Sequence, residues 1–154
     1  MLKITDAKGG TYLLEIFAKK DFTIEAKKFK DLTFPKGYYY YSGSAQKNYE
    51  HRLLRHIKPY KTIHWHIDHL TTIKSNKINK LFLFENAPKE FECKIVQDLI
   101  SLFGLSEKFH GFGNGDCKTC GTHLLYSETP IDYNHFISLY HSTVRLIPLS
   151  SETF

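Results

Sequence analysis

The sequence lacks the features that would place a protein in a membrane or in the secretory route. No apolar run approaches the roughly 18 residues needed to span a bilayer. The amino-terminal stretch "MLKITDAKGGTYLLEIF" has neither the unbroken apolar segment nor the small-residue cleavage site of a signal peptide. Internal repeats and low-complexity linkers are also missing. We therefore expect a cytoplasmic protein with no membrane contact, folded as a single domain over residues 1–154.

Cysteine is scarce, with three residues in the whole chain. An odd number of cysteines without an export signal argues against a disulfide framework, so we expect thiols. The Cys-x-x-Cys spacing is typical of metal ligands. Cys117 and Cys120 have this spacing, His123 follows three residues later, and Cys93 is available at a distance, so these four could bind a structural zinc ion. Thiols packed beneath a glycine-rich loop explain the pattern equally well, because only one of the usual two ligand pairs is present.

The sequence does contain enough apolar residues for a core, together with a concentrated positive charge. Apolar residues make up 42% and charged residues 24%, which is a globular composition. The net charge is +5, but residues 19–61 hold eleven Lys/Arg and four Asp/Glu, so this segment carries +7 and the remainder −2. A basic segment in a near-neutral body indicates a polyanionic partner, and a solvated lysine-rich surface is the alternative.

Strand-like and helix-like segments alternate along the chain. Aromatic, β-branched and apolar runs predict strands at residues 11–17, 22–26, 38–43 and 80–85. Amphipathic spacing and proline positions predict helices at residues 48–57, 64–73 and 88–103. An apolar segment resumes at residue 124, and residues 132–147 fit either a helix or a strand. We predict an α/β (α+β) fold with a small, mainly antiparallel central sheet flanked by helices, a core at about 10–126 and a C-terminal extension at 127–154.

Two predictions concern single side chains within these elements. The helix at residues 88–103 is expected to bury a stripe that includes Phe91, Ile95, Leu99 and Leu102. In the stretch "HWHID" we expect a buried Trp65, with the flanking histidines in structural or nucleic-acid contacts rather than on a metal.

Several short motifs resemble those of the GIY-YIG nuclease family in order and spacing. "GTY" at 10–12 stands where that family has Gly-Ile-Tyr, and "YSG" at 41–43 stands where it has Tyr-Ile-Gly. Arg52 and His56 then supply Arg-x-x-x-His on the next helix, and Glu92 follows on a later one. Thr11 and Ser42 depart from the usual apolar residues, and the longer interval between the motifs predicts an inserted hairpin or loop at 19–37.

The chain resembles more closely one archaeal and bacterial branch of that superfamily, which also occurs fused to DNA glycosylases of the endonuclease III type. The marks of this branch are "GYYYYSGSA", "HWHIDHL", the Glu92-Cys93 pair and "GFGNGDCKTCGTHLLY". The resemblance covers about residues 10–126.

The resemblance implies phosphodiester hydrolysis with one divalent metal ion. Glu92 would be the only protein ligand of Mg²⁺ or Mn²⁺, and Arg52 would hold a phosphate oxygen. Tyr12 and Tyr41 would aim their hydroxyls into the same cleft, one of them orienting or deprotonating the attacking water with a pKa lowered by nearby cations. His56 would transfer a proton or contact the phosphate.

Nucleic acid, DNA rather than RNA, is the expected partner. Its contacts would come from Ser44, Lys47, Arg55, His64 and His66. Each candidate residue also has an ordinary structural role open to it, as a strand aromatic, a solvated helix face or an acid at a helix start. Two other functions fit the sequence: a non-catalytic DNA- or RNA-binding module with a degenerate form of the same fold, and a zinc-stabilised interaction protein.

Overall fold

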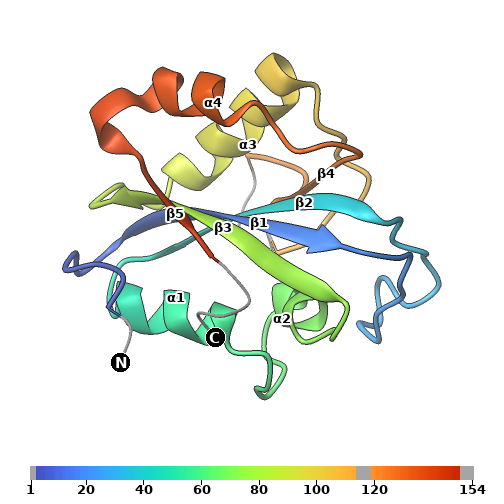
Figure 1. Ribbon diagram of the computed structural model, residues 1–154. Helices are drawn as coiled ribbons and strands as arrows, with labels where there is room; N and C mark the ends of the chain where they lie inside the picture. The colour runs from blue at the N-terminus through green and yellow to red at the C-terminus, as the bar shows by residue number, and fades with distance from the viewer. Residues whose placement is uncertain (1–2, 114–118, 150–154) are drawn as a thin grey trace.

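The computed structural model describes residues 3–113 and 119–149 and shows a five-stranded sheet between two layers of helices (Figure 1). The strand order is β4-β2-β1-β3-β5, and every neighbouring pair is antiparallel. The strands are β1 (Gly10–Ala18), β2 (Gly37–Ala45), β3 (Asn76–Glu85), β4 (Leu124–Ser127) and β5 (Arg145–Pro148). The predicted α+β class with an antiparallel sheet is confirmed.

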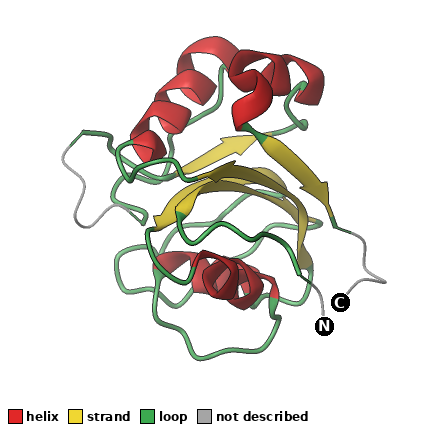
Figure 2. Ribbon diagram, turned by 90° about the vertical axis from the view of Figure 1, so that its left-hand side faces the viewer, coloured by secondary structure: helices red, strands yellow, loops and turns green. Residues whose placement is uncertain are grey.

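Helices cover both faces of the sheet, as Figures 1 and 2 show from two directions. Helices α1 (Tyr49–Ile57) and α2 (His66–Thr71) lie on one face, and α3 (Phe91–Phe103) and α4 (Tyr133–Tyr140) on the other. A 3₁₀ turn, η1 (His141–Thr143), leads from α4 to β5. None of the helices in the described part of the chain combines the length and the apolar character needed to cross a membrane.

The central strand β1 divides the apolar residues into two cores. Its side chains alternate between the faces, so Tyr12 and Leu14 pack toward α1 and α2 while Leu13 packs toward α3 and α4. Because both faces are covered, β1 is apolar almost throughout. Its buried polar residues are Thr11 and Glu15, and the carboxylate of Glu15 accepts hydrogen bonds from the hydroxyls of Tyr40 (2.6 Å) and Tyr133 (2.7 Å).

The segment between β1 and β2 is an inserted loop, as predicted, but it contains no strand at residues 22–26. Phe22 and Phe34 form one isolated bridge, with N···O distances of 2.9 and 2.8 Å. Their rings stack at 5.1 Å, and Phe34 also stacks on Phe109 at 4.2 Å. The apolar residues of this segment close the loop onto the core beside the sheet, and this is why their β-like pattern gave a wrong prediction.

The buried side of α3 differs from the predicted stripe. Leu102 is 52% exposed, whereas Val96 is buried together with Ile95 and Leu99. Residues 132–147, which fitted either type of element, form a helix and then a strand. Since β5 pairs with residues 80–83 of β3, the end of the chain completes the sheet.

Candidate active site

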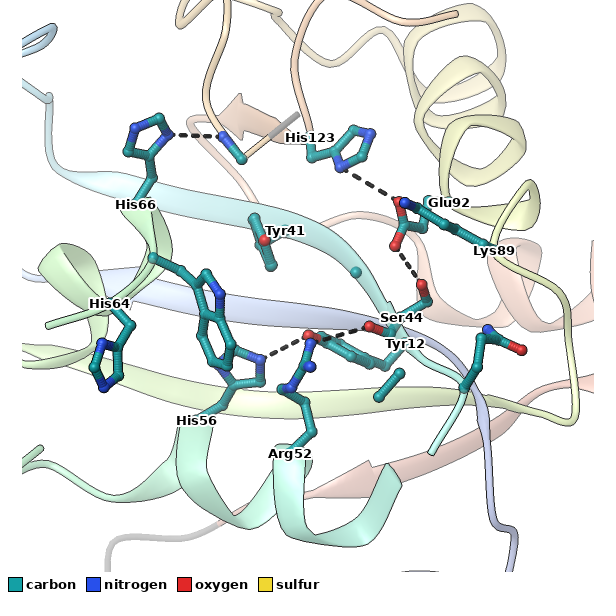
Figure 3. A pocket seen from close by; sticks show the side chains of 15 residues that line it. Tyr12, Tyr41, Ser44, Arg52, His56, His64, His66, Lys89, Glu92 and His123 are labelled. Atoms are coloured by element: carbon teal, nitrogen blue, oxygen red, sulfur yellow. Dashed lines mark hydrogen bonds and ion pairs between the residues drawn. The ribbon is translucent and has the colours of Figure 1, made fainter. Parts of the chain in front are cut away.

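A cavity of about 570 Å³ lies beside the ends of β1 and β2 (Figure 3). Its lining includes every residue predicted to be catalytic, namely Tyr12, Tyr41, Arg52, His56 and Glu92. Of the residues predicted to contact nucleic acid, Ser44, His64 and His66 also line it. Lys47 is exposed and lies outside this lining.

The short glycine motif on β2 makes room for a phenol from β1. Gly43 is the register partner of Tyr12. A Cβ atom added at Gly43 would lie 2.6 Å from the Tyr12 hydroxyl, a distance at which the two atoms overlap. On the far side, Gly113 has a φ of +70°, and a Cβ there would lie 2.7 Å from Tyr41. The two glycines therefore permit both phenols to occupy the cavity wall.

Tyr12 and His56 form a buried hydrogen bond of 2.7 Å between the phenol oxygen and Nε2 (Figure 3). Burial, with the nearby charge of Lys61 as the next cause, lowers the pKa of His56 to about 3. The imidazole is therefore neutral at pH 7 and offers one nitrogen as donor and one as acceptor. The Tyr12 hydroxyl can therefore donate to Nε2 when the proton of the neutral ring is on Nδ1.

The pKa values of the phenols do not show the predicted decrease. Burial raises the pKa of Tyr12 and holds that of Tyr41 well above its ordinary value. Arg52 lowers both, but its charge does not outweigh the loss of hydration. Both hydroxyls are therefore protonated at neutral pH and act as hydrogen-bond donors.

Glu92 enters the cavity from the opposite helix layer, past the open edge of the sheet. β4 pairs with β2 only over residues 38–41, so the end of β2 is left free to meet the first turn of α3. There Ser42 Oγ donates to the main-chain oxygen of Glu92 (2.9 Å), and the Ser44 hydroxyl donates to Glu92 Oε2. Burial raises the pKa of the carboxyl group, while the Ser44 hydrogen bond and the charges of Lys89 and Arg52 oppose that rise.

His123 faces the other carboxylate oxygen of Glu92, with 3.7 Å between Nδ1 and Oε1 (Figure 3). Burial lowers the pKa of His123 to about 4, so the ring is neutral at pH 7 and does not form an ion pair with Glu92 there. His123 therefore adds no positive charge beside this oxygen of Glu92.

Arg52 stands across Ser44 from Glu92. Its Nη1 donates to the main-chain oxygen of Ser44 at 3.1 Å, while the Ser44 hydroxyl donates to the carboxylate of Glu92 (Figure 3). Among the described residues, no ion pair joins Arg52 to Glu92. Arg52 and Glu92 thus share one cavity without a direct salt bridge, and each retains capacity for a ligand.

The arginine one turn further along α1 has a structural task. Arg55 donates to both carboxylate oxygens of Asp68 (3.0 and 2.9 Å) and to the main-chain oxygen of Thr62 (2.8 Å). These bonds hold the segment between α1 and α2 against the helix. His66 is similarly engaged, since its Nδ1 accepts from the backbone N–H of Gly113 at 3.0 Å.

The cavity rim contains residues that sequence reasoning missed. Trp65, predicted to be buried, is 38% exposed and lines the cavity, together with Lys89 and Gln46. The guanidinium carbons of Arg52 and Arg55 each lie 4.4 Å from the centre of the Trp65 ring. The sequence feature that could have indicated this contact is the short separation of Trp65 from Arg52 and Arg55 on the preceding helix.

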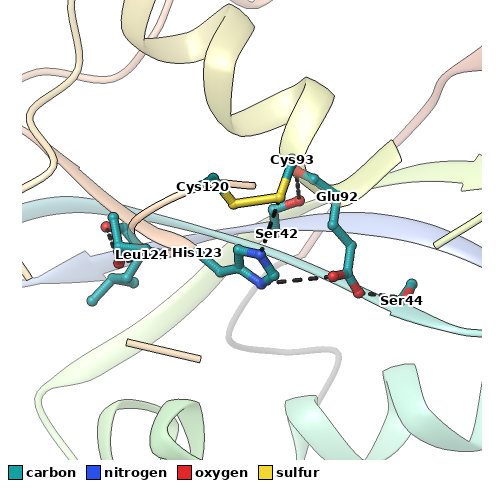
Figure 4. Close-up of a disulfide and its surroundings, with 8 residues drawn as sticks. Ser42, Ser44, Glu92, Cys93, Cys120, His123 and Leu124 are labelled. Carbon is teal, nitrogen blue, oxygen red and sulfur yellow. Dashed lines mark hydrogen bonds and ion pairs between the residues drawn. A yellow bond between two sulfur atoms is a disulfide. The ribbon is translucent and has the colours of Figure 1, made fainter. Parts of the chain in front are cut away.

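The structure joins Cys93 and Cys120 in a disulfide (Figure 4). This corrects the prediction of thiols: an odd cysteine count excludes a fully paired framework, but it does not exclude one bridge. Cys93 Sγ also lies 3.6 Å from His123 Nε2, and the ligand atoms of Cys93, Cys120 and His123 lie within 4.8 Å of one another. Three of the candidate zinc ligands are therefore together, and the fourth, Cys117, falls outside the described residues.

Comparison with known proteins yields one match. A family model described as "Domain of unknown function DUF123" matches residues 11–146. The match includes the strands and helices that build the cavity, and it continues through α4 into β5. No curated protein and no solved structure matches the chain.

Proposed function

The chain belongs to the family described as "Domain of unknown function DUF123", a description that names no reaction. From the residues of the cavity, we propose that the protein hydrolyses phosphodiester bonds in DNA. The observation that carries this proposal is the placement of Arg52 and Glu92 on either side of Ser44, beside two protonated phenols. A phosphodiester needs a cation for its oxygens and a positioned water for attack. The resemblance to GIY-YIG nucleases rests on the same residues and supports the same chemistry.

The residues present fit one divalent cation at Glu92. This is the only carboxylate among the described residues that line the cavity. Burial disfavours its charged form, so a cation beside it would stabilise the carboxylate. A single hard oxygen ligand in an open cavity suits Mg²⁺ or Mn²⁺, which keep most of their water ligands. The ion, when bound, supplies Lewis-acid charge for a phosphoryl oxygen.

The remaining residues have complementary tasks in our proposal. Arg52 binds a non-bridging phosphate oxygen through its guanidinium fork. The Tyr41 hydroxyl donates to the phosphate, and Tyr12 orients the attacking water. Tyr12 accepts the proton of that water while its own proton moves to His56 Nε2, along the 2.7 Å hydrogen bond. An anionic phosphate in the cavity would raise the pKa of His56, because it offsets the surrounding cationic charges.

The first prediction tests the carboxylate. Purified protein is incubated with single-stranded DNA, plasmid DNA and RNA, each in Mg²⁺ and in Mn²⁺. We expect cleavage of DNA, and a loss of about 10²–10³-fold in Glu92→Gln, the loss typical when one preorganised charged group is removed. The matched control is Glu90→Gln, an exposed carboxylate on the residue that precedes α3, which should cleave like the unchanged protein.

Two results would reject the nuclease. One is equal cleavage by Glu92→Gln and Glu90→Gln, which would place the activity elsewhere or in a contaminant. The other is a folded protein that binds DNA but cleaves none of the substrates. This second result would favour the alternative function, a non-catalytic binding module that uses Arg52 and Lys89 for phosphate contacts. Its binding should weaken as the salt concentration rises.

We also propose that the reduced protein holds Zn²⁺ at Cys93, Cys120 and His123, because their ligand atoms cluster within 4.8 Å. Zinc requires thiolates, so the disulfide and the metal exclude each other. The second prediction is about one zinc per chain after purification with a thiol reductant, and none after oxidation, measured by elemental analysis with a thiol count. A reduced protein that holds no zinc at micromolar Zn²⁺ would overturn this proposal.

A further inference from the structure

Trp65 is the single tryptophan of the chain, and it lies where solvent, the cavity and positive charge meet. Its side chain is 38% exposed, while most of the other large aromatic residues are buried in the two cores. Exposing a large indole to water is unfavourable, and the guanidinium groups of Arg52 and Arg55 cover only part of this ring. Trp65 therefore has the position of a contact residue for a ligand in the cavity.

The backbone at Trp65 is held without help from the indole. Asp68 Oδ2 accepts hydrogen bonds from the backbone N–H groups of His64 (2.9 Å) and Trp65 (3.0 Å). Asp68 is itself completely buried and is fixed by the two hydrogen bonds from Arg55. The ring is thus mounted on a rigid segment, and stacking against it would cost little additional conformational entropy.

The same arginine connects the ring to the proposed phosphate site. The Arg52 guanidinium carbon lies 4.4 Å from the centre of the Trp65 ring, and Arg52 is the group that holds the phosphate in the proposed reaction. A nucleotide carries its phosphate and its base on one sugar, so one nucleotide can reach both groups. Arg55, also 4.4 Å from the ring centre, adds positive charge close to the stacking position.

We propose that Trp65 is a stacking platform for an unpaired nucleobase next to the bound phosphodiester, so that the cavity takes nucleic acid with a single-stranded segment. In a duplex each base is covered by its neighbours in the stack and presents no free face to an aromatic side chain. An unpaired base does present a free face, and stacking on an aromatic side chain contributes enough affinity to favour single-stranded over duplex nucleic acid. The inference rests on the proposed function and adds the substrate class to it.

The unique tryptophan gives a direct measurement that does not need cleavage. Glu92→Gln is titrated with a single-stranded 12-mer and with its blunt duplex at one salt concentration, while tryptophan emission is recorded. We expect the single strand to quench the emission and the duplex to leave it nearly unchanged. Equal quenching by both, or none by either at saturation of binding, would overturn the platform.

Two variants separate stacking from a structural role of the ring. In the same background, with labelled oligonucleotides, Trp65→Leu should weaken single-strand binding by about 5- to 150-fold and leave duplex binding unchanged. Trp65→Tyr keeps an aromatic face and should retain most of the preference. If Trp65→Leu weakens both ligands equally, the ring only supports Arg52 and Arg55, and the inference is wrong.

The two proposals fail in distinguishable ways. Single-strand binding through Trp65 without any cleavage rejects the nuclease and keeps the platform. Cleavage that depends on Glu92, with a ratio of single-strand to duplex cleavage that Trp65→Leu leaves unchanged, rejects the platform and keeps the nuclease. Should Trp65→Leu not fold, the emission titration of the protein with its own tryptophan still decides.

Discussion

At the scale of single residues, two buried histidines determine how the protein responds to acid. His56 is 1% and His123 is 3% exposed, and burial lowers their pKa values to about 3 and about 4. The unfolded chain binds a proton on each histidine near pH 6.5, which the native protein does not. The stability that these two neutral histidines contribute is fully present above about pH 6.5. It is lost as the pH falls toward their native pKa values, with a slope of about 1.4 kcal/mol per pH unit for each histidine.

The third prediction follows from this slope. Urea unfolding of His56→Gln between pH 4.5 and 7 should give a pH dependence shallower by about one proton than that of the unchanged protein. His64→Gln is the control for the substitution itself, because the His64 side chain is exposed on the cavity rim. An unaltered slope in His56→Gln would mean that this ring is not the proton acceptor lost on folding.

The catalytic candidates could be predicted from the sequence because they stand in the order and spacing of the GIY-YIG motifs, and the fold brings these motifs together. Tyr12 and Gly43 meet by register, and Arg52 and His56 share one face of α1 by their spacing of four. The environment of each residue could not be predicted in this way. Burial, which raises the pKa of Tyr12, depends on how α1 packs over the sheet, and the exposure of Trp65 depends on a loop held by Asp68 and Arg55.

At the scale of elements, the inserted loop at residues 19–36 depends on one aromatic cluster. Phe34 is fully buried and stacks with Phe22 at 5.1 Å and with Phe109 at 4.2 Å. The fourth prediction is that Phe34→Ala lowers the free energy of unfolding by about 3–5 kcal/mol, the usual cost of removing a buried phenylalanine. Leu32→Ala, at a side chain that is 43% exposed in the same loop, should change it by less than about 0.5 kcal/mol.

Chemical denaturation of the two variants measures this difference. A loss of stability for Phe34→Ala as small as that for Leu32→Ala would show that the loop is not anchored by the stack.

The wrong prediction of a strand at residues 22–26 is explained by the burial of the same aromatic cluster. The alternation of apolar residues at 22–26 correctly indicates that Phe22 and Ile24 are buried. Because both edges of β1 are already paired, with β2 and β3, this segment is buried without joining the sheet.

At the scale of the whole molecule, the sheet separates the site from the apolar core that lies beneath α3 and α4. The cavity uses the α1 and α2 face, while α3 and α4 cover the other face and contribute only Glu92 and its neighbours. On that second face, Phe136 is fully buried and lies 5.0 Å from the ring of Phe82. The end of the chain is therefore structural, and its contribution lies far from the cavity chemistry.

The fifth prediction is that a chain ending at Tyr126 does not fold. It would lose α4 and β5, and so uncover the apolar face of the sheet around Phe82 and leave the outer edge of β3 unpaired. We expect loss of the near-ultraviolet circular dichroism signal and of a cooperative unfolding transition, compared with the full chain. Leu139→Ala, at an exposed side chain of α4, controls for changes that leave the core intact. A cooperative transition in the shortened chain would show instead that residues 3–126 suffice, and that α4 and β5 only cover a core that is already stable.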